Sequence, residues 1–317
     1  MLVGPDQREF AIHKKLLCAT SPFFRNSLDA VPAALAATPA LPAANRSGDA
    51  PPTSAGVLWL SGESPNMFEL FVLWLYQRRA FPTLVDETIN ALTRNSPPSA
   101  KVEASQTALH WNLVRLHLFA AAVDLPALQD VAMDALQDLY LRCDWDVSAR
   151  FVRYLYERDP EHAFRLRKWA VAMVAWTLAA NGHDENDPVP HSFQRLFNAY
   201  PDLCDDYAVH LDKMAGSRAN VAIKNPQLRL PANRLRSEER HFGFRQCSFH
   251  SHRSAVGEGR CPLLSLASAP PLPEKKRVIR SDSDSSDSIE MAIAARMEWR
   301  GKASLRLRSV SDPETMI

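Results

Sequence analysis

The spacing of apolar residues near the start of the chain changes from alternating to helical. Apolar and polar residues alternate around Phe10, which is typical of a strand. Ser21-Pro22 predicts the beginning of a helix, because serine caps free backbone N–H groups and proline fits the first turn. The apolar run 57–60 predicts a second strand, and 66–77 carries apolar residues at helical spacing. The start of the chain is therefore expected to mix short strands with helices.

Helical spacing dominates from residue 107 to residue 214, after a polar stretch at 95–106 that predicts a loop. Five helices are indicated here, and Leu125-Pro126 separates the first two. The most apolar of the five, 169–180, is too short to cross a bilayer, which needs roughly 20 residues. The apolar faces of the first two helices consist of Leu113, Leu116, Ala120 and Val123, and of Leu128, Val131, Ala135 and Leu139.

Two stretches interrupt this pattern. Residues 30–56 are rich in Ala, Pro and Ser and contain no aromatic residue, so they cannot bury much apolar surface and are predicted to be a disordered insertion. Beyond residue 214 apolar periodicity fades. The pattern predicts three regions, a domain at 1–141, a helical extension at 142–214 and a mostly disordered tail at 215–317.

Charge follows the same division. Through Met214 there are 19 basic and 25 acidic residues, a net charge of −6, and from Ala215 onward there are 18 and 11, a net charge of +7. An acidic body with a basic tail indicates two regions with different physical roles. The five cysteines are thinly spread and odd in number, which favours a reducing compartment, the nucleus or cytoplasm, without a disulfide framework.

Three groups of residues resemble a known family. They are Val3-Gly4 with Phe10-x-Ile12-His13-Lys14-x-Leu16-Leu17-x3-Ser21-Pro22-Phe23-Phe24, then Phe68-x2-Phe71-x2-Trp74-Leu75-Tyr76, and then Trp111-Asn112-Leu113-Val114-Arg115-Leu116 with Leu125-x2-Leu128-x3-Ala132-x2-Ala135-Leu136. Together they resemble the BTB/POZ domain family, and filamentous-fungal BTB proteins in particular. The resemblance covers about residues 1–141.

This resemblance implies an α+β fold in which a small sheet is flanked by a cluster of helices. It also implies binding of proteins, through dimerisation with itself or another chain, or as a substrate adaptor of a cullin-3 ubiquitin ligase. Two departures bear on strand-mediated dimerisation. Met1 falls within the first strand, where family members carry a few more residues, and the Ala/Pro-rich insertion is long.

A cluster of cysteine and histidine residues in the tail suggests a metal site. Cys247-x2-His250-x-His252-x8-Cys261 offers two thiolates and two imidazoles, a donor set that suits tetrahedral zinc. A small knuckle at 241–262 is therefore expected to bind zinc. The alternative is a disordered basic stretch in which these four residues occur without a shared role.

Further along the tail, a basic cluster precedes a run of serine and aspartate. The basic cluster resembles a nuclear-import signal, and it consists of Lys275, Lys276, Arg277 and Arg280. Ser281 and Ser283 stand in an acidic context that suits an acid-directed kinase. Each phosphate would add roughly −1.5 to −2 charge beside the basic cluster and so mask the import signal.

The last short motif matches the phosphorylated form that 14-3-3 proteins recognise. Arg308, Ser309, Ser311 and Pro313 follow the pattern R-S-x-S-x-P. Such recognition depends on an arginine cluster of the partner that captures the phosphate. The sequence therefore predicts 14-3-3 proteins as partners of the phosphorylated C-terminus.

Enzyme and nucleic-acid functions find less support. The chain contains no Gly-rich phosphate loop, no G-x-S-x-G elbow and no H-E-x-x-H motif. The basic segment 218–280 has few aromatic residues for stacking bases. The preferred interpretation is a non-enzymatic interaction scaffold with a phospho-regulated tail. The alternatives are a cullin-3 adaptor and a nuclear regulator that touches nucleic acid through the Cys/His tail.

Overall fold

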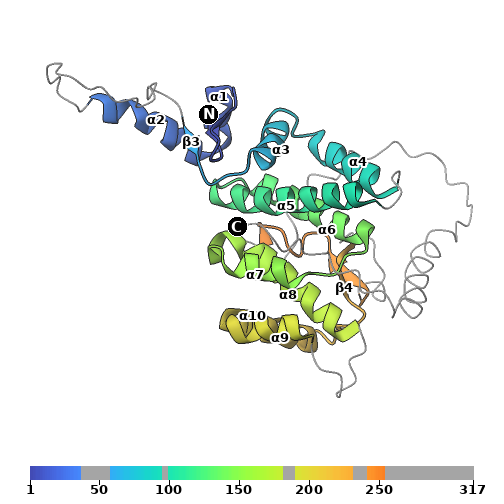
Figure 1. Cartoon of the computed structure of the whole chain (residues 1–317). Coiled ribbons are helices and arrows are strands. Elements are labelled where there is room, and N and C mark those ends of the chain that lie inside the picture. The colour runs from blue at the N-terminus through green and yellow to red at the C-terminus, as the bar shows by residue number, and fades with distance from the viewer. Residues whose placement is uncertain (37–57, 95–98, 181–189, 231–240, 254–317) are drawn as a thin grey trace, which may run out of the picture. The chain divides into compact units, whose positions relative to one another are not determined.

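The computed structural model describes residues 1–36, 58–94, 99–180, 190–230 and 241–253. One compact unit spans Met1–Gly259. Within the described residues it contains ten helices, a three-stranded sheet and a two-stranded sheet. The fold is therefore mostly helical, with a smaller share of strand than an α+β description suggests (Figure 1).

The three-stranded sheet lies at the N-terminal end of this unit. Strand β1 (Leu2–Val3) pairs antiparallel with β2 (Arg8–Glu9) and parallel with β3 (Trp59–Leu60), which gives the order β2-β1-β3. Gly4, with φ of 80°, turns the chain between β1 and β2, and an added Cβ there would lie 3.0 Å from the Pro65 ring. The apolar run 57–60 thus contains a strand as predicted, whereas the first hairpin ends just before Phe10.

Two helices connect this hairpin to β3. Helix α1 (Lys14–Thr20) is followed directly by α2 (Pro22–Ala36), which begins at the proline that the sequence indicated. Ser21 is buried. Its Oγ accepts a hydrogen bond from the N–H of Phe23 and donates one to the carbonyl of Val123. Helix α2 continues into the segment 30–56 that was predicted to be disordered, and residues 37–57 lie outside the described residues.

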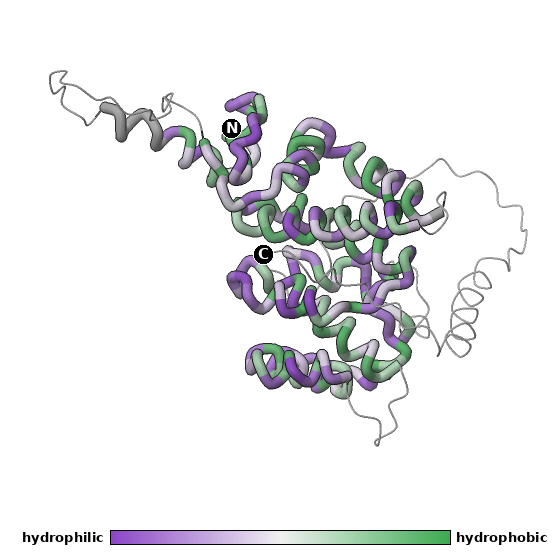
Figure 2. The backbone as a smooth tube through the Cα atoms, in the orientation of Figure 1, coloured by the Kyte–Doolittle hydropathy of each residue, from purple (hydrophilic) through white to green (hydrophobic). Residues whose placement is uncertain are grey.

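Four helices follow β3, namely α3 (Pro65–Tyr76), α4 (Phe81–Arg94), α5 (Ala100–Ala122) and α6 (Pro126–Cys143). Helix α5 begins inside the stretch 95–106 that was predicted to be a loop. The Ser99 hydroxyl accepts the N–H of Val102, and this cap lets the helix start among residues whose polar side chains face solvent. Hydrophobic and hydrophilic residues alternate along these helices in Figure 2, as expected for amphipathic helices.

The predicted helical extension consists of α7 (Ala149–Tyr156), α8 (Pro160–Ala180), α9 (His191–Ala199) and α10 (Pro201–Gly216). Its boundary with the preceding domain, predicted at 141/142, falls inside α6. Helix α8 packs against both α5 and α10, so the extension shares a core with the N-terminal part of the chain. That core includes Trp169, which is fully buried.

Part of the predicted disordered tail is folded, within residues 215–230 and 241–253, and the rest of it lies outside the described residues. Strand β4 (Asn225–Leu230) pairs in parallel with β5 (Gly243–Arg245), and β4 packs against α6 and α8 (Figure 1). The carbonyl of Pro226 accepts hydrogen bonds from the Gln137 amide, at 2.8 Å, and from the Trp169 indole, at 3.2 Å. Polar contacts to the backbone hold this strand, which explains why apolar periodicity did not reveal it.

Candidate metal centre

Three aspartates on helix α6 form one stripe, since Asp130, Asp134 and Asp138 are spaced four residues apart. Asp130 is buried, with 9% of its side chain exposed, and the other two side chains are 25% exposed. Carboxylates in such surroundings require a compensating cation or hydrogen-bond donors. The stripe faces β4 and the segment that follows β5.

Arg229 of β4 compensates the C-terminal half of this stripe. One guanidinium nitrogen lies 2.9 Å from Asp134 Oδ1, and another lies 2.6 Å from Asp138 Oδ2. Burial alone would lower the pKa of Arg229, but the two carboxylates outweigh it and raise that pKa above its ordinary value. The bidentate clamp fastens β4 to α6 and leaves Asp130 to other partners.

The N-terminal half of the stripe meets the histidine segment, which we define as residues 246–253. The Ser251 backbone N–H donates to Asp130 Oδ1 at 2.5 Å, and His252 Nδ1 lies 3.3 Å from Asp130 Oδ2. His250 lies between two carboxylates, with Nε2 2.9 Å from Asp134 Oδ1 and Nδ1 3.8 Å from Asp130 Oδ2. Residues more than a hundred positions apart in sequence thus form one cluster.

Within this cluster, Asp130, His250 and His252 can each offer one ligand atom, and the three atoms lie within 4.8 Å of one another. Two buried ring nitrogens, His250 Nδ1 and His252 Nε2, have no hydrogen-bond partner. Buried polar atoms are nearly always satisfied in native proteins. An arrangement of two imidazoles and a carboxylate is therefore a possible metal-binding cluster.

Two further side chains border the cluster. Arg165 of α8, 4% exposed, donates to the Ser251 carbonyl at 3.3 Å. His117 of α5 is 1% exposed, and neither of its ring nitrogens has a hydrogen-bond partner. Burial, followed by the charges of Arg165 and His250, lowers the pKa of His117 to about 3, so this imidazole is neutral. The cluster is thus enclosed by α5, α6, α8 and the histidine segment.

The predicted zinc site is borne out only in part. The structure brings His250 and His252 together, as the sequence indicated. It does not place the buried Cys247 in the ligand group, and Cys261 lies outside the described residues. Asp130 takes part instead, and sequence reasoning missed it. The spacing of the three aspartates is visible in the sequence, but the burial of Asp130 depends on partners more than a hundred residues away.

The other predicted sites lie outside the described residues. The nuclear-import, acid-directed kinase and 14-3-3 motifs all fall in this region and stay predictions. Their residues are Lys275, Lys276, Arg277, Arg280, Ser281, Ser283, Arg308, Ser309, Ser311 and Pro313.

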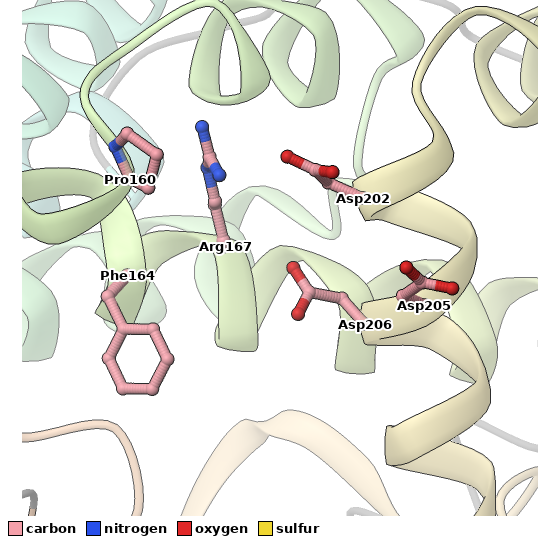
Figure 3. A pocket seen from close by; sticks show the side chains of 6 residues that line it. All are labelled: Pro160, Phe164, Arg167, Asp202, Asp205 and Asp206. Atoms are coloured by element: carbon pink, nitrogen blue, oxygen red, sulfur yellow. The ribbon is translucent and has the colours of Figure 1, made fainter.

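An open depression of about 270 Å³ lies between α8 and α10 (Figure 3). Its lining consists of Pro160, Phe164, Arg167, Asp202, Asp205 and Asp206. The Arg167 guanidinium is already bound by the carbonyls of Leu155 and Arg158, at 3.1 and 2.8 Å. Tyr156 donates to Asp206 at 2.6 Å, and burial together with this bond raises the pKa of Tyr156. These hydrogen bonds join α8 and α10 to the end of α7.

Comparisons with protein-family models, with curated proteins and with solved structures found no match to this chain. Among the residues that the structure describes, no helix has the length and apolar character needed to cross a membrane. The geometry of the chain itself therefore carries the functional argument.

Proposed function

We propose that this chain is a non-enzymatic protein-interaction scaffold of the BTB/POZ type, acting in the nucleus or cytoplasm. One observation carries the proposal. Large aromatic side chains are exposed in the region that resembles that family, with Trp59 50%, Tyr76 45% and Phe23 37% exposed. Tryptophan and tyrosine are enriched among the residues that dominate binding energy at protein interfaces.

Trp59 is the side chain best placed for such a role. It lies on β3, the last strand in the order β2-β1-β3, so among the described strands none pairs with the far side of β3. Its indole Nε1–H donates to the Gly4 carbonyl at 3.0 Å, which holds the ring in place. A fixed aromatic ring at a sheet edge loses little conformational entropy when a partner covers it.

A second copy of the chain is the partner to test first. We expect the full chain to self-associate, and the Trp59→Arg substitution to weaken this association by about 30-fold, equivalent to about 2 kcal/mol for an interface tryptophan. Light scattering across a concentration series gives the mass and the dissociation constant. Val209→Arg is the matched control, because Val209 of α10 is 51% exposed and lies outside the family resemblance.

Two results together would contradict the scaffold proposal. One is a native chain that stays monomeric at every concentration. The other is a Trp59→Arg variant that co-purifies the same proteins from cells as the native chain. Cullin-3 among the proteins lost by the variant would favour the adaptor form of the proposal.

Zinc is the cofactor that we assign to this scaffold. Its support is the donor set, because two imidazoles and one carboxylate suit zinc and leave a fourth position for water or another ligand. In this proposal Asp130 replaces the cysteines as a ligand, because its carboxylate lies in the same cluster as His250 and His252.

A further inference from the structure

We propose that Asp130, His250 and His252 form a divalent-metal site that fastens the histidine segment onto helix α6, with Asp134 as the supporting carboxylate. The inference rests on the zinc part of the proposed function and is independent of self-association. It specifies a ligand set without cysteine and a structural role for the ion.

The distances between candidate ligands fit a small cation. In tetrahedral zinc sites with ligand atoms 2.0–2.1 Å from the ion, two such atoms stand about 3.3 Å apart. Asp130 Oδ2 lies 3.3 Å from His252 Nδ1 and 3.8 Å from His250 Nδ1. Both imidazoles thus approach the same carboxylate oxygen. The three ligand atoms lie within 4.8 Å of one another, so they draw closer together when an ion binds. Binding also releases the proton through which His252 Nδ1 contacts Asp130.

The tautomer of His250 points to the same conclusion. A carboxylate only accepts hydrogen bonds, so the 2.9 Å contact between Asp134 Oδ1 and His250 Nε2 requires the proton on Nε2. In the neutral ring, Nδ1 then carries a lone pair, and this buried atom has no hydrogen-bond partner. Its neighbour at 3.8 Å is the Asp130 carboxylate, which also offers lone pairs. A cation between the two atoms turns this repulsion into coordination.

Asp134 plays the part that carboxylates commonly play behind metal-bound histidines. Accepting the other ring N–H fixes the orientation of the imidazole and raises its basicity. Arg229 in turn holds Asp134 at 2.9 Å, so the support extends from the ligand into β4. This chain of contacts explains why the acidic stripe continues beyond the residue that faces the histidines.

The location of the site indicates that the ion fastens the chain and does not serve chemistry. Side-chain exposure is 9% for Asp130 and 7% for His250, which leaves little room for a substrate. The segment that carries the histidines is further held by Ser251, whose N–H reaches Asp130 and whose carbonyl accepts from Arg165. An ion that binds the folded arrangement alone stabilises it by mass action.

The test uses the full chain, stripped with a chelator and then titrated with zinc chloride. We expect one zinc per chain by calorimetry and elemental analysis, with a higher melting temperature after zinc is added. Asp130→Asn and His252→Gln should abolish measurable binding. Asp134→Asn should weaken it by about 10- to 100-fold, the usual effect of losing such a carboxylate. Cys247→Ser is the matched control and should leave zinc affinity unchanged.

Cobalt(II) in place of zinc gives a spectroscopic readout of the ligand set in the native chain. We expect the visible d–d bands of a tetrahedral site without the intense near-ultraviolet absorption of cobalt–thiolate bonds. Asp134→Asn should shift these visible bands if Asp134 orients the metal-bound His250. The bands should stay in place if Asp134 only stabilises the fold.

Two results would overturn the inference, and they differ in meaning. A native chain that takes up no zinc or cobalt refutes both the site and the zinc part of the proposed function, and leaves self-association to be judged by light scattering. Zinc that survives Asp130→Asn and His252→Gln, but is lost with Cys247→Ser or Cys261→Ser, keeps zinc and refutes this ligand set.

Discussion

His110 of α5 lies inside a cluster of aromatic rings. The imidazole is 6% exposed, its Nε2 is 3.0 Å from the hydroxyl of Tyr140, and its ring centroid is 5.2 Å from that of Phe151. Burial lowers the pKa of His110 from the ordinary value of 6.5 to about 3. The folded chain therefore keeps this imidazole neutral where the unfolded chain would protonate it.

This difference makes the stability of the fold depend on pH. Between pH 6.5 and 3 the unfolded state binds more protons, so the stabilisation is complete above pH 6.5 and is lost as the pH falls through this range. Going from pH 7 to pH 5, we expect His110 to account for a loss of about 2 kcal/mol in the free energy of unfolding. Urea titrations of the native chain and of His110→Gln at both pH values measure the difference, since glutamine retains a polar partner for Tyr140. Equal losses in the two proteins would refute this assignment.

Individual buried residues were predictable where apolar spacing alone decides burial. The predicted apolar face is buried at Leu113, Leu116 and Ala120 of α5 and at Val123, which follows the helix. Buried polar residues were not predictable, because each depends on a partner distant in sequence. Gln137 bonds to the carbonyl of Pro226, and Asp130 meets the histidine segment. No local pattern announces such pairs, and for that reason the zinc prediction found the histidines but missed the carboxylate.

At the level of elements, the parallel pair of β4 and β5 depends on one glycine. An added Cβ on Gly243 would lie 2.9 Å from both the Cβ and the carbonyl oxygen of Leu228. The oxygen belongs to the backbone of β4, so it cannot move aside as a flexible side chain would. Any larger residue at this position therefore pushes the two strands apart.

We expect Gly243→Ala to destabilise the fold by about 1–3 kcal/mol, the usual range for overpacking. Gly62→Ala is the matched control, because nothing lies within 4 Å of the added Cβ there. That substitution should instead stabilise the chain by about 0.4–1 kcal/mol, since alanine restricts the unfolded chain. Thermal and urea unfolding of both variants measure whether each substitution lowers or raises the free energy of unfolding. Equal effects would show that β4 and β5 do not approach each other this closely.

Helices and strands were predictable where their apolar residues recur at regular spacing. The helices with regular apolar faces were found, and α4 was missed although Phe81, Val85 and Ile89, each four residues apart, are all buried. That signal was present in the sequence. Strand β4 gave no comparable signal, because the Arg229 clamp and the Pro226 carbonyl fasten it through polar contacts.

At the level of the whole molecule, α8 connects the helical extension to the rest of the chain. Trp169 is fully buried, its ring centroid is 4.9 Å from that of Tyr140 on α6, and its indole donates to the carbonyl of Pro226 in β4. One hydrophobic cluster runs from Val3 to Phe249. The described helices therefore share a core, and the sequence predicted a domain boundary inside α6 because periodicity reports on single helices and not on what they pack against.

A shared core implies that the two predicted regions unfold together. Trp169→Ala should cost about 3–5 kcal/mol, the usual range for deleting a buried tryptophan. Hydrogen exchange should then show lower protection in α5, α6 and β4 as well as in α8, because the indole contacts α6 and β4 and α8 packs against α5. Phe164→Ala on the same helix is the matched control, since that side chain is 45% exposed and its loss should change little. If α7 to α10 lost protection while α1 to α6 kept it, residues 142–214 would unfold as an independent unit. The domain boundary predicted from the sequence would then be correct, and the shared core would not make the two regions unfold together.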